Sequence, residues 1–496
     1  MLSDYRQRFG EYYSELAREE YLFRSGRSAR RDLAHIHREH SDLFRLSVIE
    51  ELRAKLDDVS DYRQTERKGI QRLIAFALEG NLAARVRELS AEIEDYEAAS
   101  RIDWDGERMA LSQAEDLLAT ESDRQRRREL HARRADVING AQDLLAERFV
   151  KLRTEAIELG YESFIAMRSQ LRGVDFSKLQ TVAEKLLEKT ESRYVASLGP
   201  LLARELGTSI DDATSADLPY LRHNTRVDAF FQCEQMLRIY RDLFSCFGFN
   251  TDKQSNVELD TDARSGKRLK AFCSPIQVPD EIKLVVNPTG GQWNYRGFLH
   301  AAGQAQAMAW TSRNIPLEFQ IGGDAAVPTA WGMLLENLML EPSWLTGTFG
   351  FVESAEFRHT LSVLRLMELR HQAAKLRYEL EFHSGKLTSG TGQRYAELMT
   401  EAVCVQFDEA DCLREVSDDF HPADFLRAAA FETQMRDYLK TKFGSRWWTS
   451  ASAGEMLIDL WNTGQQYSVE ELAAMIGLGE LDFDSLITEA QEYIER

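Results

Sequence analysis

The chain has 496 residues, of which 43% are hydrophobic and 10% aromatic, so it can form a packed core. That length suits two or three ordinary domains or one large two-lobed unit. The formal charge of −20 disfavours nucleic acid and anionic membranes as partners, because both repel an acidic surface. We therefore expect no nucleic acid and no membrane among its partners.

The cysteines indicate the compartment in which the protein works. There are 5 of them, an odd number, and none shows Cys-x-x-Cys spacing. This pattern is typical of free thiols in a reducing environment rather than of a disulfide framework. No apolar run approaches the about 18 residues that a membrane-spanning helix needs. The sequence therefore predicts a soluble protein of the cytoplasm.

Helices dominate the first part of the chain. Only 9 prolines occur in the whole sequence, and apolar residues such as Leu43, Leu46, Ile49 and Leu52 recur at helical spacing. The first clear interruption is the Thr-, Ser- and Asp-rich stretch at 207–217. We therefore predict an N-terminal helical lobe over 1–206 and a second lobe over 207–496, with the two lobes interleaving as one large unit.

One segment of the chain predicts β-structure. Residues 268–273 and 282–286 have the apolar, β-branched character of strands and flank a proline-containing turn at 275–279. The Asn-Pro-Thr-Gly-Gly run at 287–291 then ends the second strand and starts a helix that carries His300.

The helices that follow are marked by their caps. Asp324 is a good N-cap, and Pro328 falls in the tolerated first turn of a helix that ends at the Glu341-Pro342 break. Near the C-terminus, the spelling Ser468-Val-Glu-Glu471 predicts a capping box. The fold class expected from these patterns is mainly α with one small hairpin.

The run Phe-Leu-His-Ala-Ala-Gly-Gln at 298–304 has the frame of a His-Glu-x-x-His helix. In that motif two histidines one turn apart bind zinc, and the intervening glutamate is the general base. Here His300 stands at the first ligand position, Ala301 at the base and Gln304 at the second ligand. Alanine has no proton acceptor, and a neutral amide is a poor zinc ligand.

The segments 268–310 and 326–337 resemble the thimet oligopeptidase and oligopeptidase F family of zinc metallopeptidases. In that family a glutamate about 25 residues after the second histidine is the third zinc ligand, and the matching position here is Thr329. Glu336 lies two turns later, roughly 10 Å along the helix, which is too far for a substitute ligand. We interpret Glu336 as a hydrogen-bonding residue at the edge of the site.

A third segment, at 420–427, resembles the part of the family sequence that carries an oxyanion-stabilising tyrosine. The matching residue is Phe425, which has the ring without the hydroxyl. By motif the resemblance covers roughly 200–496. It implies two helical lobes that enclose a deep channel, with a small β-hairpin or sheet beside the metallopeptidase-like site.

These observations predict an oligopeptidase-like pseudoenzyme that has lost its zinc site and binds short peptides or a protein segment in its channel without cleavage. No zinc and no other cofactor is expected. The candidate cleft residues are Gly290, Gly291, His300, Gln304, Glu336, His383 and His421.

Two alternatives stay open at this point. One is an active zinc-dependent oligopeptidase with non-standard ligands, and the other is a metal-free repurposed enzyme or an assembly subunit. The sequence leaves the oligomeric state open.

Overall fold

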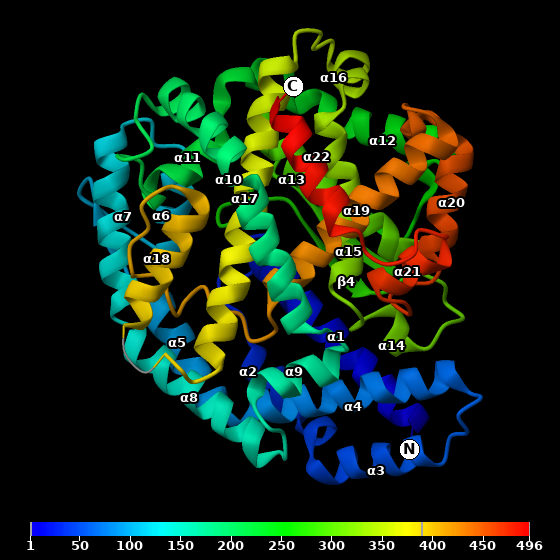
Figure 1. Ribbon diagram of the computed structural model, residues 1–496. Helices are drawn as coiled ribbons and strands as arrows, with labels where there is room; N and C mark the ends of the chain where they lie inside the picture. The colour runs from blue at the N-terminus through cyan, green and yellow to red at the C-terminus, as the bar shows by residue number, and fades with distance from the viewer. Residues whose placement is uncertain (1, 388–389, 496) are drawn as a thin grey trace. The chain divides into compact units, whose positions relative to one another are not determined.

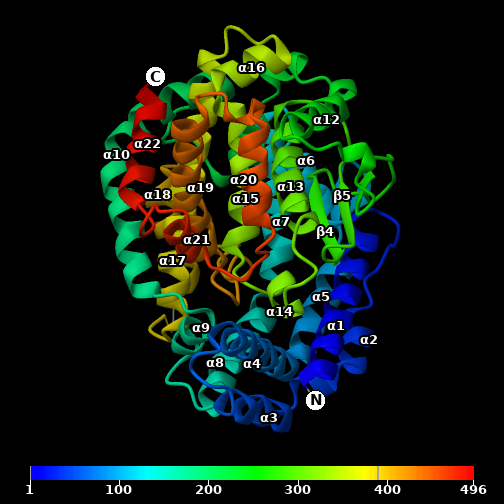
Figure 2. The same cartoon turned by 90° about the vertical axis from the view of Figure 1, so that its right-hand side faces the viewer.

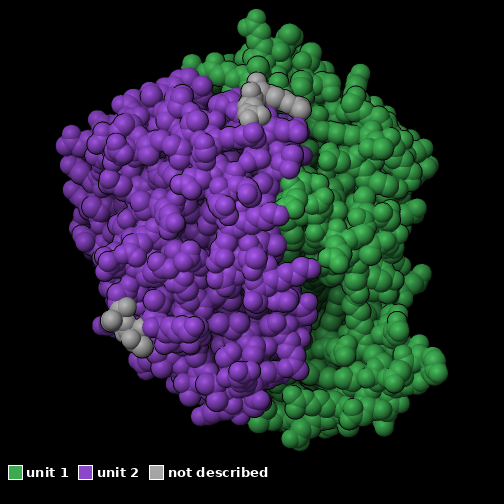
Figure 3. All heavy atoms as spheres, in the orientation of Figure 1, with its two compact units in different colours: residues 1–81, 225–358, 427–486 green, residues 82–224, 359–426, 487–496 purple. Residues whose placement is uncertain are grey.

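The computed structural model describes residues 2–387 and 390–495 and is mainly helical, with two small sheets (Figure 1). This confirms the fold class expected from the sequence. The chain divides into two compact units, coloured in Figure 3: unit 1 is 1–81, 225–358 and 427–486, and unit 2 is 82–224, 359–426 and 487–496. Each unit is built from three segments. The predicted lobe boundary after residue 206 falls at the end of helix α10 (Phe176–Leu206). The chain passes from one compact unit to the other at different positions, the first being after residue 81.

Within the described residues, the helices and strands that lie wholly in unit 1 are α1 (Leu2–Arg24), α2 (Leu33–Glu39), α3 (Leu46–Asp57), α12 (Met236–Cys246), β3 (Val257–Asp260), β4 (Phe272–Gln277), β5 (Glu281–Val285), α13 (Gln292–Ala309), α14 (Leu317–Gln320), α15 (Ala326–Glu336), α16 (Pro342–Phe349), α20 (Ala451–Trp461) and α21 (Val469–Met475).

Those that lie wholly in unit 2 are α5 (Arg87–Ala99), β1 (Ile102–Trp104), β2 (Glu107–Met109), α6 (Leu111–Leu118), α7 (Arg124–Asn139), α8 (Gln142–Glu158), α9 (Phe164–Arg172), α10 (Phe176–Leu206), α11 (Leu218–His223) and α18 (Thr391–Val403). The helices with residues in both units are α4 (Gln64–Arg85), α17 (Ala355–His383), α19 (His421–Phe443) and α22 (Phe483–Glu495). Short 3₁₀ turns connect several of these elements.

The predicted hairpin is present in unit 1. Strand β4 pairs antiparallel with β5, and β3 pairs parallel with the other edge of β5, so the strand order is β3-β5-β4. The strand limits differ from the prediction, because β4 continues through Pro275 and the turn is confined to 278–280. Proline lacks the backbone N–H that a central strand must donate, but an edge strand such as β4 tolerates it.

Helices cover both faces of this three-stranded sheet. On one face, Tyr21 of α1 packs with Phe272, Ile276 and Val285 in a buried apolar cluster. On the other face lies α13, as Figure 2 shows beside β4 and β5. The sheet therefore fixes the position of α13, the helix that carries His300.

Helix α13 begins and ends close to the predicted limits. A helix also begins just after Asp324, whose carboxylate accepts a hydrogen bond from the Ala326 N–H at 3.2 Å. The N-cap residue of α15 is Ala325, however, and the α-helix ends at Glu336, followed by a 3₁₀ turn up to Leu340. Ser468 and Glu471 form the predicted capping box of α21. None of the helices in the described parts of the chain is both long enough and apolar enough to cross a membrane.

Candidate functional site

The start of α13 is held by a side chain from a distant segment. Gly291 is the N-cap residue, with φ of 80°, and the backbone N–H of Gln292 donates to the Asp228 carboxylate at 2.9 Å. A carboxylate is favoured there by the unpaired N–H groups and the helix dipole. A Cβ atom on Gly291 would lie 2.8 Å from that carboxylate.

The same segment covers the glycine turn. A Cβ atom on Gly290 would lie 2.8 Å from the carbonyl oxygen of Phe231, and the Gly291 N–H donates to that carbonyl at 2.8 Å. Gly290 and Gly291 were predicted to form a wall of the peptide cleft. The structure instead places residues 228–233 against them, because both glycines take left-handed conformations that allow this close approach.

Helices α13 and α15 pack closely against each other, and glycines make this possible. A Cβ atom on Gly303 would lie 2.2 Å from the carbonyl oxygen of Trp331. One turn earlier on α13, the His300 ring lies against Gly332, where a Cβ atom would be 2.7 Å from Nε2. Larger residues at 303 or 332 would force the two helices apart.

Three side chains form a polar cluster at this crossing. His300 Nδ1 lies 3.1 Å from Oε2 of Glu336, and Arg296 donates to Oε1 of the same carboxylate at 2.7 Å. Arg296 precedes His300 by four residues, so both side chains lie on one face of α13. The side chains of His300 and Glu336 are 25% and 22% exposed, which leaves the cluster accessible at one side.

The Glu336 carboxylate stays ionised although it is largely buried. Burial alone would raise its pKa, but the positive charge of Arg296 and the hydrogen bond from His300 outweigh it and hold the pKa of Glu336 well below its ordinary value. Glu336 is therefore a fixed negative charge held between the Arg296 cation and the His300 ring.

The other motif positions do not face this cluster with metal-binding atoms. Ala301 is 1% exposed and packed in the core. Gln304 is half-buried, and its amide is neutral. The Thr329 hydroxyl donates to the backbone carbonyl of Ala325 at 2.8 Å, one turn earlier on α15.

These residues do not fit a catalytic zinc ion. Such a site needs about three His, Cys, Asp or Glu ligands and an open position for water. Among the described residues, no group of three or more such side chains is placed to hold a metal ion. His300 has Glu336 as its neighbour, but that carboxylate is shared with Arg296.

Two further predicted residues belong to the other unit. Phe425 is half-buried and His421 exposed, and both lie in the part of α19 that belongs to unit 2. His383 was predicted to line a cleft, but it is 2% exposed. Aromatic rings surround it, the nearest being Phe164 at 4.6 Å between centroids, so it is a core residue.

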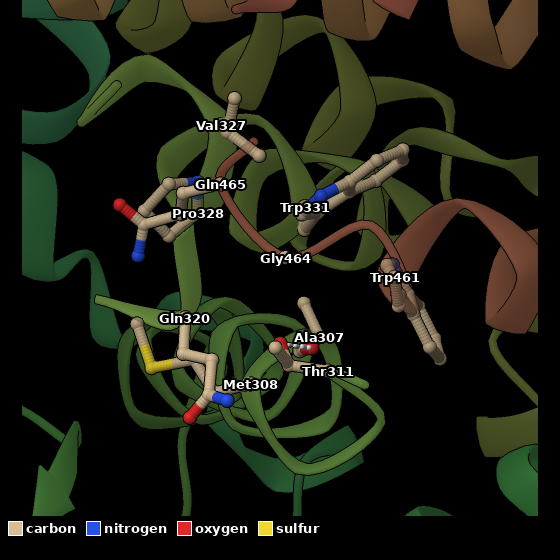
Figure 4. A pocket seen from close by; sticks show the side chains of 10 residues that line it. All are labelled: Ala307, Met308, Thr311, Gln320, Val327, Pro328, Trp331, Trp461, Gly464 and Gln465. Atoms are coloured by element: carbon tan, nitrogen blue, oxygen red, sulfur yellow. Dashed lines mark hydrogen bonds between the residues drawn. The ribbon is translucent and has the colours of Figure 1, made fainter. Parts of the chain in front are cut away.

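A small cavity lies farther along the α13–α15 contact. Its volume is about 10 Å³, which is room for about one water molecule. Figure 4 shows Ala307 of α13 and Thr311, which lies just beyond that helix, opposite Val327 and Pro328 of α15, with Trp461 at one side. The cavity is too small for a peptide side chain. Because Ala307 lies near Val327, Gly303 against Trp331 and His300 against Gly332, the two helices run antiparallel along this face.

Arg296 and Asp228 contribute to the site but were not singled out from the sequence. Arg296 could have been found, because its i, i+4 spacing from His300 places it on the same helix face. Asp228 could not, since it lies 64 residues before the N–H group that it caps.

Comparisons with known proteins bear on the fold. No family model matches the sequence, and no curated protein matches it. Among solved structures, a candidate oligoendopeptidase F has 16% sequence identity and a TM-score of 0.70, covering 99% of this chain and 90% of its own. PZ peptidase A, solved with an inhibitor, has 16% identity and a TM-score of 0.67, covering 90% and 84%. The chain therefore has the fold of these peptidases.

Proposed function

We propose that this protein binds short peptides, or an extended segment of a partner protein, on an oligopeptidase fold without hydrolysing them. Zinc takes no part in this proposed function. The proposal would make the chain a pseudoenzyme that keeps the architecture of a peptidase and uses it for capture.

One observation carries the proposal: His300 is the single strong zinc donor at the motif positions, because the other three hold Ala301, Gln304 and Thr329. Ala301 supplies no base, and the Thr329 hydroxyl is bonded to its own helix. A peptidase of this type needs a metal-bound water and a base to attack the amide. The described side chains at these positions supply neither.

Peptide capture is supported by the sheet beside α13. Strand β4 pairs with β5 alone among the described strands, so no strand pairs with the backbone N–H and C=O groups of its outer edge. An extended peptide can pair with such an edge without any metal. Pro275 removes one donor and so limits how a second chain could pair there.

The test combines binding and turnover on the full-length protein. A fluorescent library of short peptides is titrated and then recovered for mass spectrometry. We expect saturable binding with intact peptides, and weaker binding when backbone amides of the bound peptide are N-methylated, because strand pairing needs those donors. Cleavage of the peptides would contradict the proposal, and equal binding of methylated peptides would contradict strand pairing.

A second candidate is a metal-free enzyme that uses the His300–Glu336 pair. A histidine with a carboxylate on Nδ1 is a common general-base arrangement. Turnover that survives a chelator and is abolished by His300→Ala would support this candidate. Turnover that the chelator abolishes would support the third possibility, an active zinc oligopeptidase with non-standard ligands.

A further inference from the structure

Unit 2 contains a cavity that the proposed function does not use. Its volume is about 160 Å³, close to the roughly 150 Å³ of an engineered cavity that binds benzene. Helices α6, α7, α11, α17 and α18 and the loop after α18 provide its lining. Figure 1 shows α6, α7, α11 and α18 grouped in this unit.

Apart from the Arg222 guanidinium, which pairs with Glu368 at 3.0 Å, two buried polar atoms of the lining have no hydrogen-bond partner among the described residues. They are Nε2 of His371 and Oε2 of Glu415, which are both buried at the atom level. His371 is 8% exposed as a residue. The two atoms are 3.6 Å apart, too long for a hydrogen bond to each other but close enough for one donor group to bridge them.

The other charged groups of the lining already have close partners. Arg134 binds both oxygens of Asp411, at 2.8 and 2.9 Å, and His131 Nε2 lies 2.6 Å from Asp408. Glu415 interacts with the Tyr395 hydroxyl, but its Oε2 atom has no hydrogen-bond partner among the described residues. Burial lowers the pKa of His371 from its ordinary value of 6.5, so its neutral form is favoured at pH 7 and supplies no positive charge to the Glu415 side chain.

Nucleophilic catalysis does not fit the cavity. Ser215, His131 and Asp408 lie together, but Ser215 Oγ and the Asp408 carboxylate both approach Nε2 of His131, at 3.3 and 2.6 Å. A catalytic triad needs the serine and the carboxylate on different ring nitrogens. The arrangement therefore indicates binding rather than acyl transfer.

Aromatic rings line the wall next to the two unpaired atoms. The Phe407 ring lies 5.7 Å from the His371 ring and 6.3 Å from the Tyr395 ring, measured between centroids. Such a wall favours an apolar stem and also attracts a cation over a ring face. The Glu415 side chain is 32% exposed, so the acidic end of the cavity is open to solvent.

We propose that this cavity binds a small primary ammonium compound, with its –NH₃⁺ group bridging His371 Nε2 and Glu415 Oε2 and its apolar stem against Phe407 and Tyr395. An ammonium carries three N–H donors, enough to reach both atoms. The His371 tautomer with its proton on Nδ1 presents Nε2 as the acceptor. This site lies wholly in unit 2 and does not depend on peptide binding.

The test uses two ammonium probes and their neutral counterparts on the full-length protein. Benzylamine and n-butylamine are titrated by calorimetry at pH 7, with benzyl alcohol and n-butanol as controls of matched shape. We expect the amines to bind saturably and the alcohols to bind at least about tenfold more weakly than the amines. A factor of that size corresponds to the loss of a charge-assisted hydrogen bond. Equal binding of amines and alcohols would overturn the proposal without the use of any variant.

Variants locate the site. Glu415→Gln keeps the size of the side chain and removes its charge, so amine affinity should fall about tenfold or more. Glu397→Gln, a change of the same kind at an exposed residue of α18, should leave it unchanged. Amine binding that survives both Glu415→Gln and His371→Leu in folded protein would overturn the proposal. The proposal would also be overturned if the cavity bound no amine but bound Zn²⁺ in a way that depends on Glu415.

Discussion

The Nδ1 atom of His300 lies 3.1 Å from Oε2 of Glu336, and Arg296 binds the other oxygen of that carboxylate. His300, at the first position of the motif, thus belongs to an ion-paired cluster at the α13–α15 crossing. It follows that this cluster contributes to the stability of unit 1.

Glu336→Gln should destabilise the protein by about 2 kcal/mol near neutral pH, because it weakens charge-assisted hydrogen bonds to two donors. The pKa of Glu336 is held below its ordinary value of 4.5. The carboxylate therefore contributes stability above about pH 4.5, and this contribution is lost as the pH falls through the folded-state pKa. Urea unfolding of wild type and variant should show a difference that is largest at neutral pH and narrows in acid. A difference independent of pH would contradict this explanation.

Gly332→Ala should destabilise the α13–α15 crossing by about 1–3 kcal/mol, because the added Cβ would lie 2.7 Å from the His300 ring. Gly347→Ala on α16 is the matched control, since a Cβ there meets no atom within 4 Å. That control should stabilise the protein by roughly 0.5–1 kcal/mol through helix propensity. Chemical denaturation of both variants checks the prediction, which fails if the two changes have the same sign.

Restoring two ligands should create a zinc site. Because Gln304 and Thr329 lie on facing stretches of two antiparallel helices, Gln304→His with Thr329→Glu would add two donors to His300. We expect about one zinc per chain by elemental analysis of the double variant, and its loss when His300→Ala is added. The single variant Gln304→His should bind far more weakly. Folded double variant without zinc would show that these positions do not converge.

His383→Phe should stabilise the protein, and more so in acid. Both ring nitrogens are buried and have no hydrogen-bond partner among the described residues, and burial lowers the pKa of His383 from 6.5 to about 3. Between these values the unfolded chain binds a proton that the folded chain does not, so wild-type stability falls as the pH drops through this window. The pH-dependent part of the gain should be about 2 kcal/mol at pH 5 and close to zero at pH 8. An equal gain at both pH values would contradict this account.

The elements that the sequence predicts well are those with local signals. The helix of His300, the Asp324 cap and the Ser468–Glu471 capping box depend on neighbouring residues alone. Strand β3 was not predicted, because its four residues acquire their role only by pairing with β5, more than twenty residues later. The turn of the hairpin was placed too early because Pro275 was taken to end the first strand. An edge strand tolerates proline, so β4 continues through this residue.

For the candidate site, the motif indicated the helices that carry its residues. His300, Gln304 and Thr329 lie on the two helices where the motif placed them. The direct contact of Glu336 with His300 depends on how closely α13 and α15 approach, which Gly303 and Gly332 set through the tertiary fold. His383 was misplaced because its burial depends on aromatic residues from distant helices, including Phe164.

The most direct test of the central claim is the zinc content and peptide turnover of the wild-type protein, purified without chelator and supplied with excess zinc. Our account predicts no stoichiometric zinc after dialysis and full recovery of an intact peptide library. One tightly bound zinc per chain, with peptide cleavage that both a chelator and His300→Ala abolish, would contradict it.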